Sequence, residues 1–199
     1  PGALPSLTSI VISGGTISLP DTGGITSACP ITINGGTLTP GSGALTAITG
    51  LVVNGGGTLS LSNAGGITAD CPVTINANGV IKASHPDAFG GITNVLGNND
   101  GRIELSNNVT ISGVTYSGTG DGSNNRGLLQ SITGNNTWAG PIEIRAADTG
   151  VSGDRFGSAA TATLTITGTI TDTSASHNAP FTIRNDNGGT LVLGGTGHD

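Results

Sequence analysis

Acidic side chains are the first candidates for catalysis in this sequence, which carries 12 of them. Cleavage of a polysaccharide needs a pair of carboxylates, or carboxylates that bind calcium beside a basic side chain. The closest grouping is Asp148, Asp154 and Arg155, and the glycines around it indicate a solvated loop. No acidic position recurs at a fixed interval along the chain, so the pattern predicts no catalytic residue and no enzyme.

A calcium loop is the second candidate. Asp121, Ser123 and Asn125 place oxygen ligands at alternate positions, as calcium-binding loops do. The bidentate glutamate that closes such a loop is missing, because Ile132 holds its place. These three residues are weak candidates for a metal site, and an ordinary Asp-Gly turn is the alternative.

The other titratable residues are spread too widely for a site. Glu104 and Glu143 lie two positions from Arg102 and Arg145, which predicts exposed ion pairs between coils with little energetic weight. The histidines lack metal-ligand spacing and nucleophile partners: His85, His177 and His198. We therefore expect no cofactor.

Composition limits the class of protein. The 199 residues include 36 Gly but only 9% charged and 3% aromatic residues, so Val, Ile, Leu and Thr must build the core. These residues favour strands. The net charge of −6, with only six basic residues, argues against nucleic-acid binding. No apolar run approaches the ~20 residues of a membrane span, and the abundance of small polar residues suggests an extracellular protein.

A repeat of about 21 residues organises the first part of the chain. Thr16, Thr37 and Thr58 are evenly spaced at this interval, and each is followed by an aliphatic and then a hydroxyl residue. Each unit holds three short alternating segments separated by Gly or Asn, as in residues 31–48. Three strands joined by sharp corners make one triangular coil, and coils stacked about 4.8 Å apart make a solenoid.

The sequence therefore predicts an all-β fold, a right-handed parallel β-helix (β-solenoid) with ~21-residue triangular coils. We expect one continuous solenoid with regular coils over 1–82, irregular coils with longer loops over 83–126, and repeat-like coils again over 127–199. A ladder of stacked amides is expected at one corner, from Asn34, Asn54 and Asn76.

Two cysteines test this geometry. The phrases GGITSACP (23–30) and GGITADCP (65–72) place Cys29 and Cys71 two repeat intervals apart, which corresponds to two coils. Their separation along the axis is then roughly 9.6 Å, beyond the ~7 Å that a disulfide allows between Cα atoms. We expect two unbridged, buried thiols.

The most regular outward surface is a hydroxyl array formed by Thr16 and Ser18, Thr37 and Thr39, and Thr58 and Ser60. Its pairs would repeat at about 4.8 Å between coils and about 7 Å along each strand, which resembles the array of ice-binding β-solenoids. The array ends where Val80 and Lys82 occupy the next coil, and any water-facing strand rich in β-branched residues shows a similar ladder. Trp138 is a further candidate for an interaction surface, because an exposed indole stacks on sugars; a structural role is the alternative.

Three phrases near the end are GNNTWAGPIEI (134–144), TLTITGTI (163–170) and NGGTLVLGGTG (187–197). They resemble the autotransporter-associated β-strand repeat of type V secreted passengers and related bacterial surface proteins. The matching residues are Gly189, Thr190, Leu191, Leu193 and Gly195 for the strand, and Asn136, Thr137, Trp138 and Gly140 for the turn. The likeness covers 127–199 well and 1–82 loosely, and it fails where Gly197-His198-Asp199 replaces an Asn-Thr-Tyr turn. It implies an extracellular parallel β-helix whose repeat carries no catalytic residues.

These observations predict a non-catalytic, extracellular structural or adhesive β-solenoid of a bacterial cell surface. The chain starts and stops within repeat phrases, which favours end-to-end self-association into a fibre or continuation in a longer repeat chain. The alternatives are a polysaccharide-binding or polysaccharide-cleaving β-helix, and an ice-binding solenoid. Surface glycans are the other expected class of partner; neither nucleic acid nor a membrane span is expected.

Overall fold

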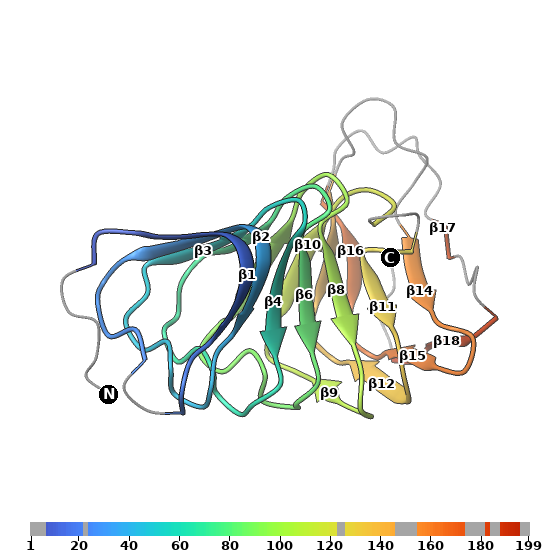
Figure 1. The fold of residues 1–199 in the computed structure, drawn as a ribbon. Coiled ribbons are helices and arrows are strands. Elements are labelled where there is room, and N and C mark those ends of the chain that lie inside the picture. The colour runs from blue at the N-terminus through green and yellow to red at the C-terminus, as the bar shows by residue number, and fades with distance from the viewer. Residues whose placement is uncertain are drawn as a thin grey trace.

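The computed structural model describes residues 7–21, 24–122, 126–145, 155–173, 182–183 and 188–195. Every regular element in these residues is a β-strand, and every pair of neighbouring strands is parallel. The strands follow one another along a single axis, with β1 toward one end and β18 toward the other (Figure 1). The predicted parallel β-solenoid is confirmed.

The first face of the solenoid is a ladder that runs along its whole described length. Its strands, in order along the axis, are β1 (Ile10–Ser18), β2 (Pro30–Thr39), β3 (Gly50–Val53), β5 (Val73–Ile75), β7 (Asn94–Gly97), β10 (Thr115–Gly118), β13 (Ile142–Ile144) and β16 (Ile170–Asp172). β1 and β2 are long because each bends through a corner and continues onto the next face. β2 pairs with β3 before its bend and with β4 after it.

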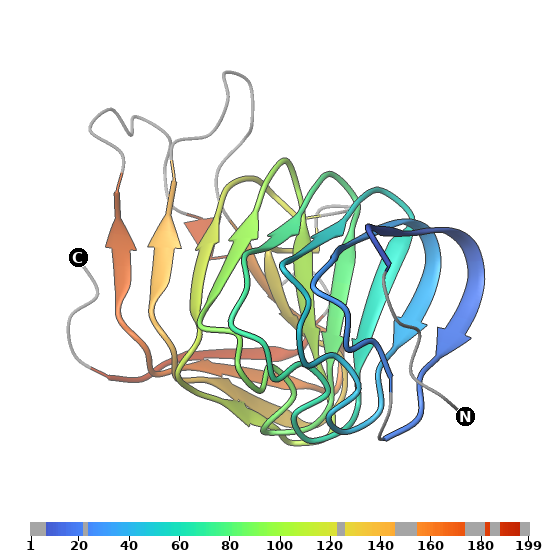
Figure 2. The ribbon, with the colours of Figure 1, turned by 90° about the vertical axis from the view of Figure 1, so that its left-hand side faces the viewer.

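The other two faces complete a three-sided coil, which Figure 2 shows from the side. After the bends of β1 and β2, the second face holds β4 (Gly57–Leu61), β6 (Val80–Ala83), β8 (Arg102–Leu105), β11 (Leu129–Ser131), β14 (Arg155–Ser158) and β17 (Thr182–Ile183). The third face begins as single bridges that link Ile25, Leu45 and Ile67. It continues as a sheet of β9 (Thr110–Ile111), β12 (Asn135–Trp138), β15 (Thr163–Ile166) and β18 (Thr190–Leu193).

Alternation along the short strands produces the core. Successive side chains of a strand point to opposite faces, so every second residue enters the coil. In β3 and β4 the buried residues are Leu51, Val53, Leu59 and Leu61, and the residues between them are half-buried. Parallel pairing in register places each inward side chain on its counterpart in the next coil, which gives continuous columns of Ile, Leu and Val.

The corner between the first and second faces divides the molecule into two regions. It holds four residues between β5 and β6 and again between β7 and β8, and it has an Asn-x-x-Gly sequence, as in Asn76–Gly79. It then lengthens to ten residues between β10 and β11 and between β13 and β14. We call the part up to Gly118 the tight-corner region and the part from Thr119 onward the long-loop region.

The predicted repeat of about 21 residues is right for the tight-corner region only. On the first face, the partners that follow one another at nearly equal intervals are Ile10, Ile31, Leu51, Val73, Val95 and Tyr116. Tyr116 then pairs with Ile142, and Ile142 pairs with Ile170, so the interval is longer in each of these two coils. The physical reason is local: the three strands keep their places, and the extra residues enter the coil at the lengthened corner.

Candidate functional site

The predicted hydroxyl array is present on the second face. Thr16, Thr37 and Thr58 are register partners, and Ser18 pairs with Thr39. Thr16 and Ser18 are exposed, and the later members are half-buried. The next coil replaces Thr58 by Val80 and Ser60 by Lys82, so the array ends where the sequence predicted. It is a short, ordered patch of hydroxyls with no acidic or basic group among its members.

A second hydroxyl array, which sequence reasoning missed, lies on the third face and extends through the long-loop region. Thr110, Thr137 and Thr165 are register partners, and so are Asn135, Thr163 and Thr190. Thr110, Asn135 and Thr190 are exposed, and the others are half-buried. The signal was available as alternating Thr phrases at a longer interval, but a search at the shorter period of the first coils passes over it.

The prediction that Trp138 belongs to an interaction surface is wrong, because its side chain is fully buried. It packs edge-on against Phe89, with ring centroids 6.0 Å apart, and against Tyr116 at 6.2 Å. The Tyr116 hydroxyl donates to the carbonyl of Gly101 at 2.9 Å. The alternative interpretation of Trp138, a structural role within the coil, is the one that the structure supports.

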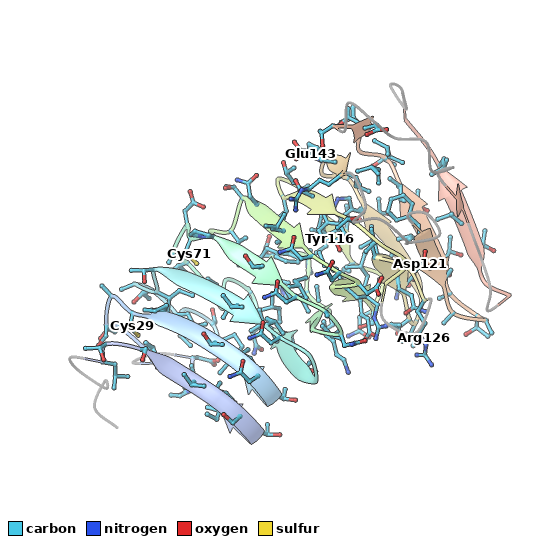
Figure 3. All side chains as sticks on the ribbon, turned by 90° about the horizontal axis from the view of Figure 1, so that it is seen from above. Cys29, Cys71, Tyr116, Asp121, Arg126 and Glu143 are labelled. Carbon is cyan, nitrogen blue, oxygen red and sulfur yellow. The ribbon has the colours of Figure 1, made fainter. Side chains whose placement is uncertain are left out.

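Of the three calcium candidates, only Asp121 lies in the described residues, because Ser123 and Asn125 fall outside them. Asp121 is buried at the start of the first long corner, near Arg126 (Figure 3). Its backbone N–H donates to the Asp100 carboxylate at 2.8 Å, and its carbonyl accepts from Gly127 at 2.8 Å. Within the described ranges, no three His, Cys, Asp or Glu side chains come together as a metal site. The geometry is that of an Asp-based turn.

The arginine–glutamate pairs differ from the exposed cross-coil pairs that the sequence suggested. Arg102 bonds Glu104 within one strand at 2.6 Å, and the two side chains are only 7% and 12% exposed. Lys82, on the preceding coil, lies 3.9 Å from the other Glu104 oxygen and is 54% exposed. Glu143 instead accepts a short hydrogen bond from the Ser117 hydroxyl. Glu104 is thus paired with two cations, and Glu143 is engaged by a hydroxyl group.

An amide ladder runs along the tight corner, as predicted, and is one member longer. Asn54 donates to Asn34 at 2.6 Å and Asn76 donates to Asn54 at 2.8 Å. Asn98 then donates to Asn76 at 3.2 Å, and the Asn98 oxygen accepts from Arg145 at 3.1 Å. The ladder binds each coil to the next, so these polar side chains serve cohesion.

Asn136, which the family resemblance placed in a turn, is a buried amide clamp. Its oxygen accepts from the N–H of Val109 at 3.0 Å. Its amide nitrogen donates to the Ser131 hydroxyl at 2.7 Å and to the Thr133 carbonyl at 2.8 Å, with a longer contact to Leu105. Since a buried amide must be satisfied, Asn136 fixes the chain that enters the third face in two successive coils.

Cys29 and Cys71 are free, buried thiols on one side of the solenoid (Figure 3). The predicted separation of two coils is confirmed, because Thr49 bonds back to Cys29 and Leu51 bonds forward to Pro72. Burial, reinforced by the Asp70 carboxylate, raises the pKa of the Cys71 thiol. A raised pKa disfavours the thiolate that nucleophilic chemistry needs.

Several sequence candidates lie outside the described residues, namely Asp148, Asp154, His177 and His198. Arg155 begins β14, and nothing is described of its side chain. His85 lies 4.0 Å from the Asp87 carboxylate, and its Nδ1 accepts from the Asp87 N–H at 3.1 Å. This contact closes a surface turn and does not assemble a catalytic group.

No family model, no curated protein and no solved structure matches this chain. In the part that the structure describes, there is no helix with the length and hydrophobicity to cross a membrane. The residues and their geometry are therefore the basis for a functional conclusion.

Proposed function

We propose that this chain is a non-catalytic structural or adhesive solenoid of a bacterial cell surface. The observation that carries the proposal is the use of its polar side chains. The amides of the ladder and the Asn136 clamp bind one coil to the next, and Arg102 is engaged by Glu104 within β8. Such a molecule transmits force along its axis and presents ordered strand faces to its surroundings.

The extracellular setting is supported by composition and by the resemblance to autotransporter-associated repeats. A chain with 9% charged residues and 36 glycines gains its stability from repeated backbone pairing and small side chains. The same design suits secreted passengers, which the phrases around Asn136 and Thr190 resemble. Surface exposure and attachment to glycans are parts of the proposal.

End-to-end assembly is also part of the proposal. Val11 and Ile17 in β1 are 59% and 40% exposed, and Val192 and Leu193 in β18 are 40% and 39% exposed. Strand edges with apolar side chains favour pairing with further β-structure. Further coils of the same kind, from a longer chain or a second copy, have the chemistry to cover them.

The decisive experiment separates a scaffold from a polysaccharide-cleaving solenoid. The purified 199-residue chain is incubated with plant and bacterial polysaccharides, with and without calcium, and products are measured by mass spectrometry. We expect no cleavage, and any turnover that survives repurification overturns the proposal. Antibody labelling of intact producing cells then tests the location: labelling without permeabilisation supports a surface role, and labelling that requires lysis contradicts it.

A further inference from the structure

The amide ladder stops in the middle of the solenoid. Gly97 pairs with Gly118 in the next coil. Thr119 therefore occupies the position in that coil that corresponds to Asn98. A threonine is too short to continue the ladder, and the Thr119 hydroxyl is buried without a hydrogen-bond partner. The corner also lengthens from four residues to ten at this coil. The junction between the two regions thus loses a contact that every earlier pair of ladder coils has.

Arg145 reaches back across this gap. Ile144 pairs with Gly118, so Arg145 lies one coil beyond Thr119 and two coils beyond Asn98. Its backbone N–H bonds the Gly118 carbonyl at 2.9 Å, and its guanidinium Nη1 bonds Oδ1 of Asn98 at 3.1 Å. Two coil spacings are roughly 10 Å. An extended arginine side chain and its 3.1 Å hydrogen bond together span this distance, whereas a threonine or asparagine side chain is too short.

The direction of the ladder explains why a cation suits its end. Each amide nitrogen donates to the oxygen of the preceding coil, from Asn98 to Asn76, from Asn76 to Asn54 and from Asn54 to Asn34. The Asn98 oxygen is therefore the last acceptor of the series. Hydrogen bonds to a charged donor are stronger than those between neutral groups, and a chain of amides polarised in one direction strengthens the terminal acceptor.

A second contact that skips a coil, that of β9, crosses the junction inside the core. Phe89 lies on the third face in the coil before β9, and Trp138 lies in the coil after β9. Their rings nevertheless meet edge to face at 6.0 Å, and Tyr116 joins them from the coil between. The junction is thus bridged on the outside by Arg145 and on the inside by the aromatic rings.

We propose that Arg145 is a strap that couples the unfolding of the long-loop region to the tight-corner region. In a solenoid each coil normally contacts only its neighbours, so a weak interface lets one end fray independently. A hydrogen bond that skips a coil raises the cost of separating the regions at the interface where the amide ladder ends. This inference rests on the fold alone, and it stands or falls independently of the proposed surface role.

Hydrogen exchange measured by mass spectrometry on the full chain tests the strap. In Arg145→Ala we expect amides of β13 and β15 to exchange roughly fivefold faster, since a half-exposed charged hydrogen bond is lost, with β2 to β6 unchanged. In Arg145→Lys, which keeps a cation and the fold, the exchange rates of β13 and β15 should lie between those of the wild type and those of Arg145→Ala. The matched control is Lys82→Ala, which removes a long cationic side chain whose ion pair, with Glu104, reaches only the neighbouring coil. It should leave the exchange rates of β13 and β15 unchanged.

A double-mutant cycle identifies the partner. If the strap acts through Asn98, adding Asn98→Ala to Arg145→Ala causes no further rise in the exchange rates of β13 and β15. Independent, multiplicative effects of the two substitutions overturn the proposal. So does an Arg145→Ala or Arg145→Lys profile in which faster exchange is confined to the residues next to position 145.

Discussion

The tight-corner and long-loop regions share three faces and parallel pairing but are held together by different kinds of contact. In the tight-corner region an amide stacks at the same exposed corner in successive coils, and the core columns are mainly aliphatic, as at Leu51 and Leu59. In the long-loop region the amide of Asn136 lies inside the coil, and Trp138 and Phe156 are fully buried.

The difference shows two ways to stabilise a solenoid. In the aliphatic coils of the tight-corner region, repetition supplies many small and nearly equal contributions to stability, so that no single side chain there is decisive. The long-loop region instead concentrates its stability in a few large or fully bonded side chains. Single substitutions should therefore lower the free energy of unfolding by similar amounts along the tight-corner region. In the long-loop region, large losses should be confined to a few residues.

The largest expected effect is at Trp138. Trp138→Ala should lower the free energy of unfolding by about 4 kcal/mol, because it leaves a large cavity between Phe89 and Tyr116. Urea unfolding followed by circular dichroism measures it. Trp138→Phe is the matched control and should lose less than half as much. A loss below about 1 kcal/mol for the alanine variant would show that the aromatic rings contribute little to the core.

The two kinds of amide give the next contrast. Asn136→Ala should cost about 3 kcal/mol, because it leaves the buried N–H of Val109 without its acceptor and the buried Ser131 hydroxyl without its amide donor. Asn54→Ala breaks two ladder bonds at an accessible corner, where water replaces them, and should cost about 1 kcal/mol. Both are read from the same urea transitions. Equal costs for the two variants would remove the distinction between the regions.

Much of the tight-corner region could be predicted from the sequence. Thr16, Thr37 and Thr58 recur at a constant interval, and that interval fixed the fold class, the register, the end of the hydroxyl array and the separation of the cysteines. The information is local, because a coil that repeats in sequence repeats in space. Asn98, the last ladder amide, stands where the same spacing puts it.

The long-loop region was less predictable, for physical reasons that individual residues show. The ten-residue corners lengthen the period beyond that of the first coils, so Thr137 and Thr165 were not recognised as partners. The burial of Trp138 depends on Phe89, which lies far away in sequence. Likewise, the contact of Arg145 with Asn98 spans 47 positions and skips a coil. Non-periodic contacts of this kind leave no spacing to read.

A smaller effect, visible only at alkaline pH, is expected at Cys71 in the tight-corner region. Its pKa is raised by burial and by Asp70, so the unfolded thiol ionises before the folded one. Stability should therefore be unaffected below the usual thiol pKa and should fall as the pH rises through the folded value. Thermal unfolding of wild type and Cys71→Val across this range measures the difference, which should grow with pH. A difference independent of pH would mean that burial does not penalise the thiolate.

The smallest expected effect concerns the outer surface of the second face, where the two regions meet. Along one outward column, Lys82 is 54% exposed and its partner Glu104 12% exposed, while Gln130 in the following coil is 1% exposed. The first long corner covers this end of the column. Gly157 is the register partner of Gln130 in the next coil, and a β-carbon there would clash with the carbonyl oxygen of Arg126, a residue of that corner.

Lys82→Ala should therefore change the free energy of unfolding by less than about 0.5 kcal/mol, because the ion pair is long, solvated and screened by salt. Glu104→Ala should cost more, since it leaves the buried guanidinium of Arg102 without its 2.6 Å partner. The two variants are compared in low and high salt by urea unfolding. If Lys82→Ala lowers the free energy of unfolding as much as Glu104→Ala does, the exposed part of this column contributes as much to stability as the covered part. The contrast between the regions would then be confined to the core and the corners.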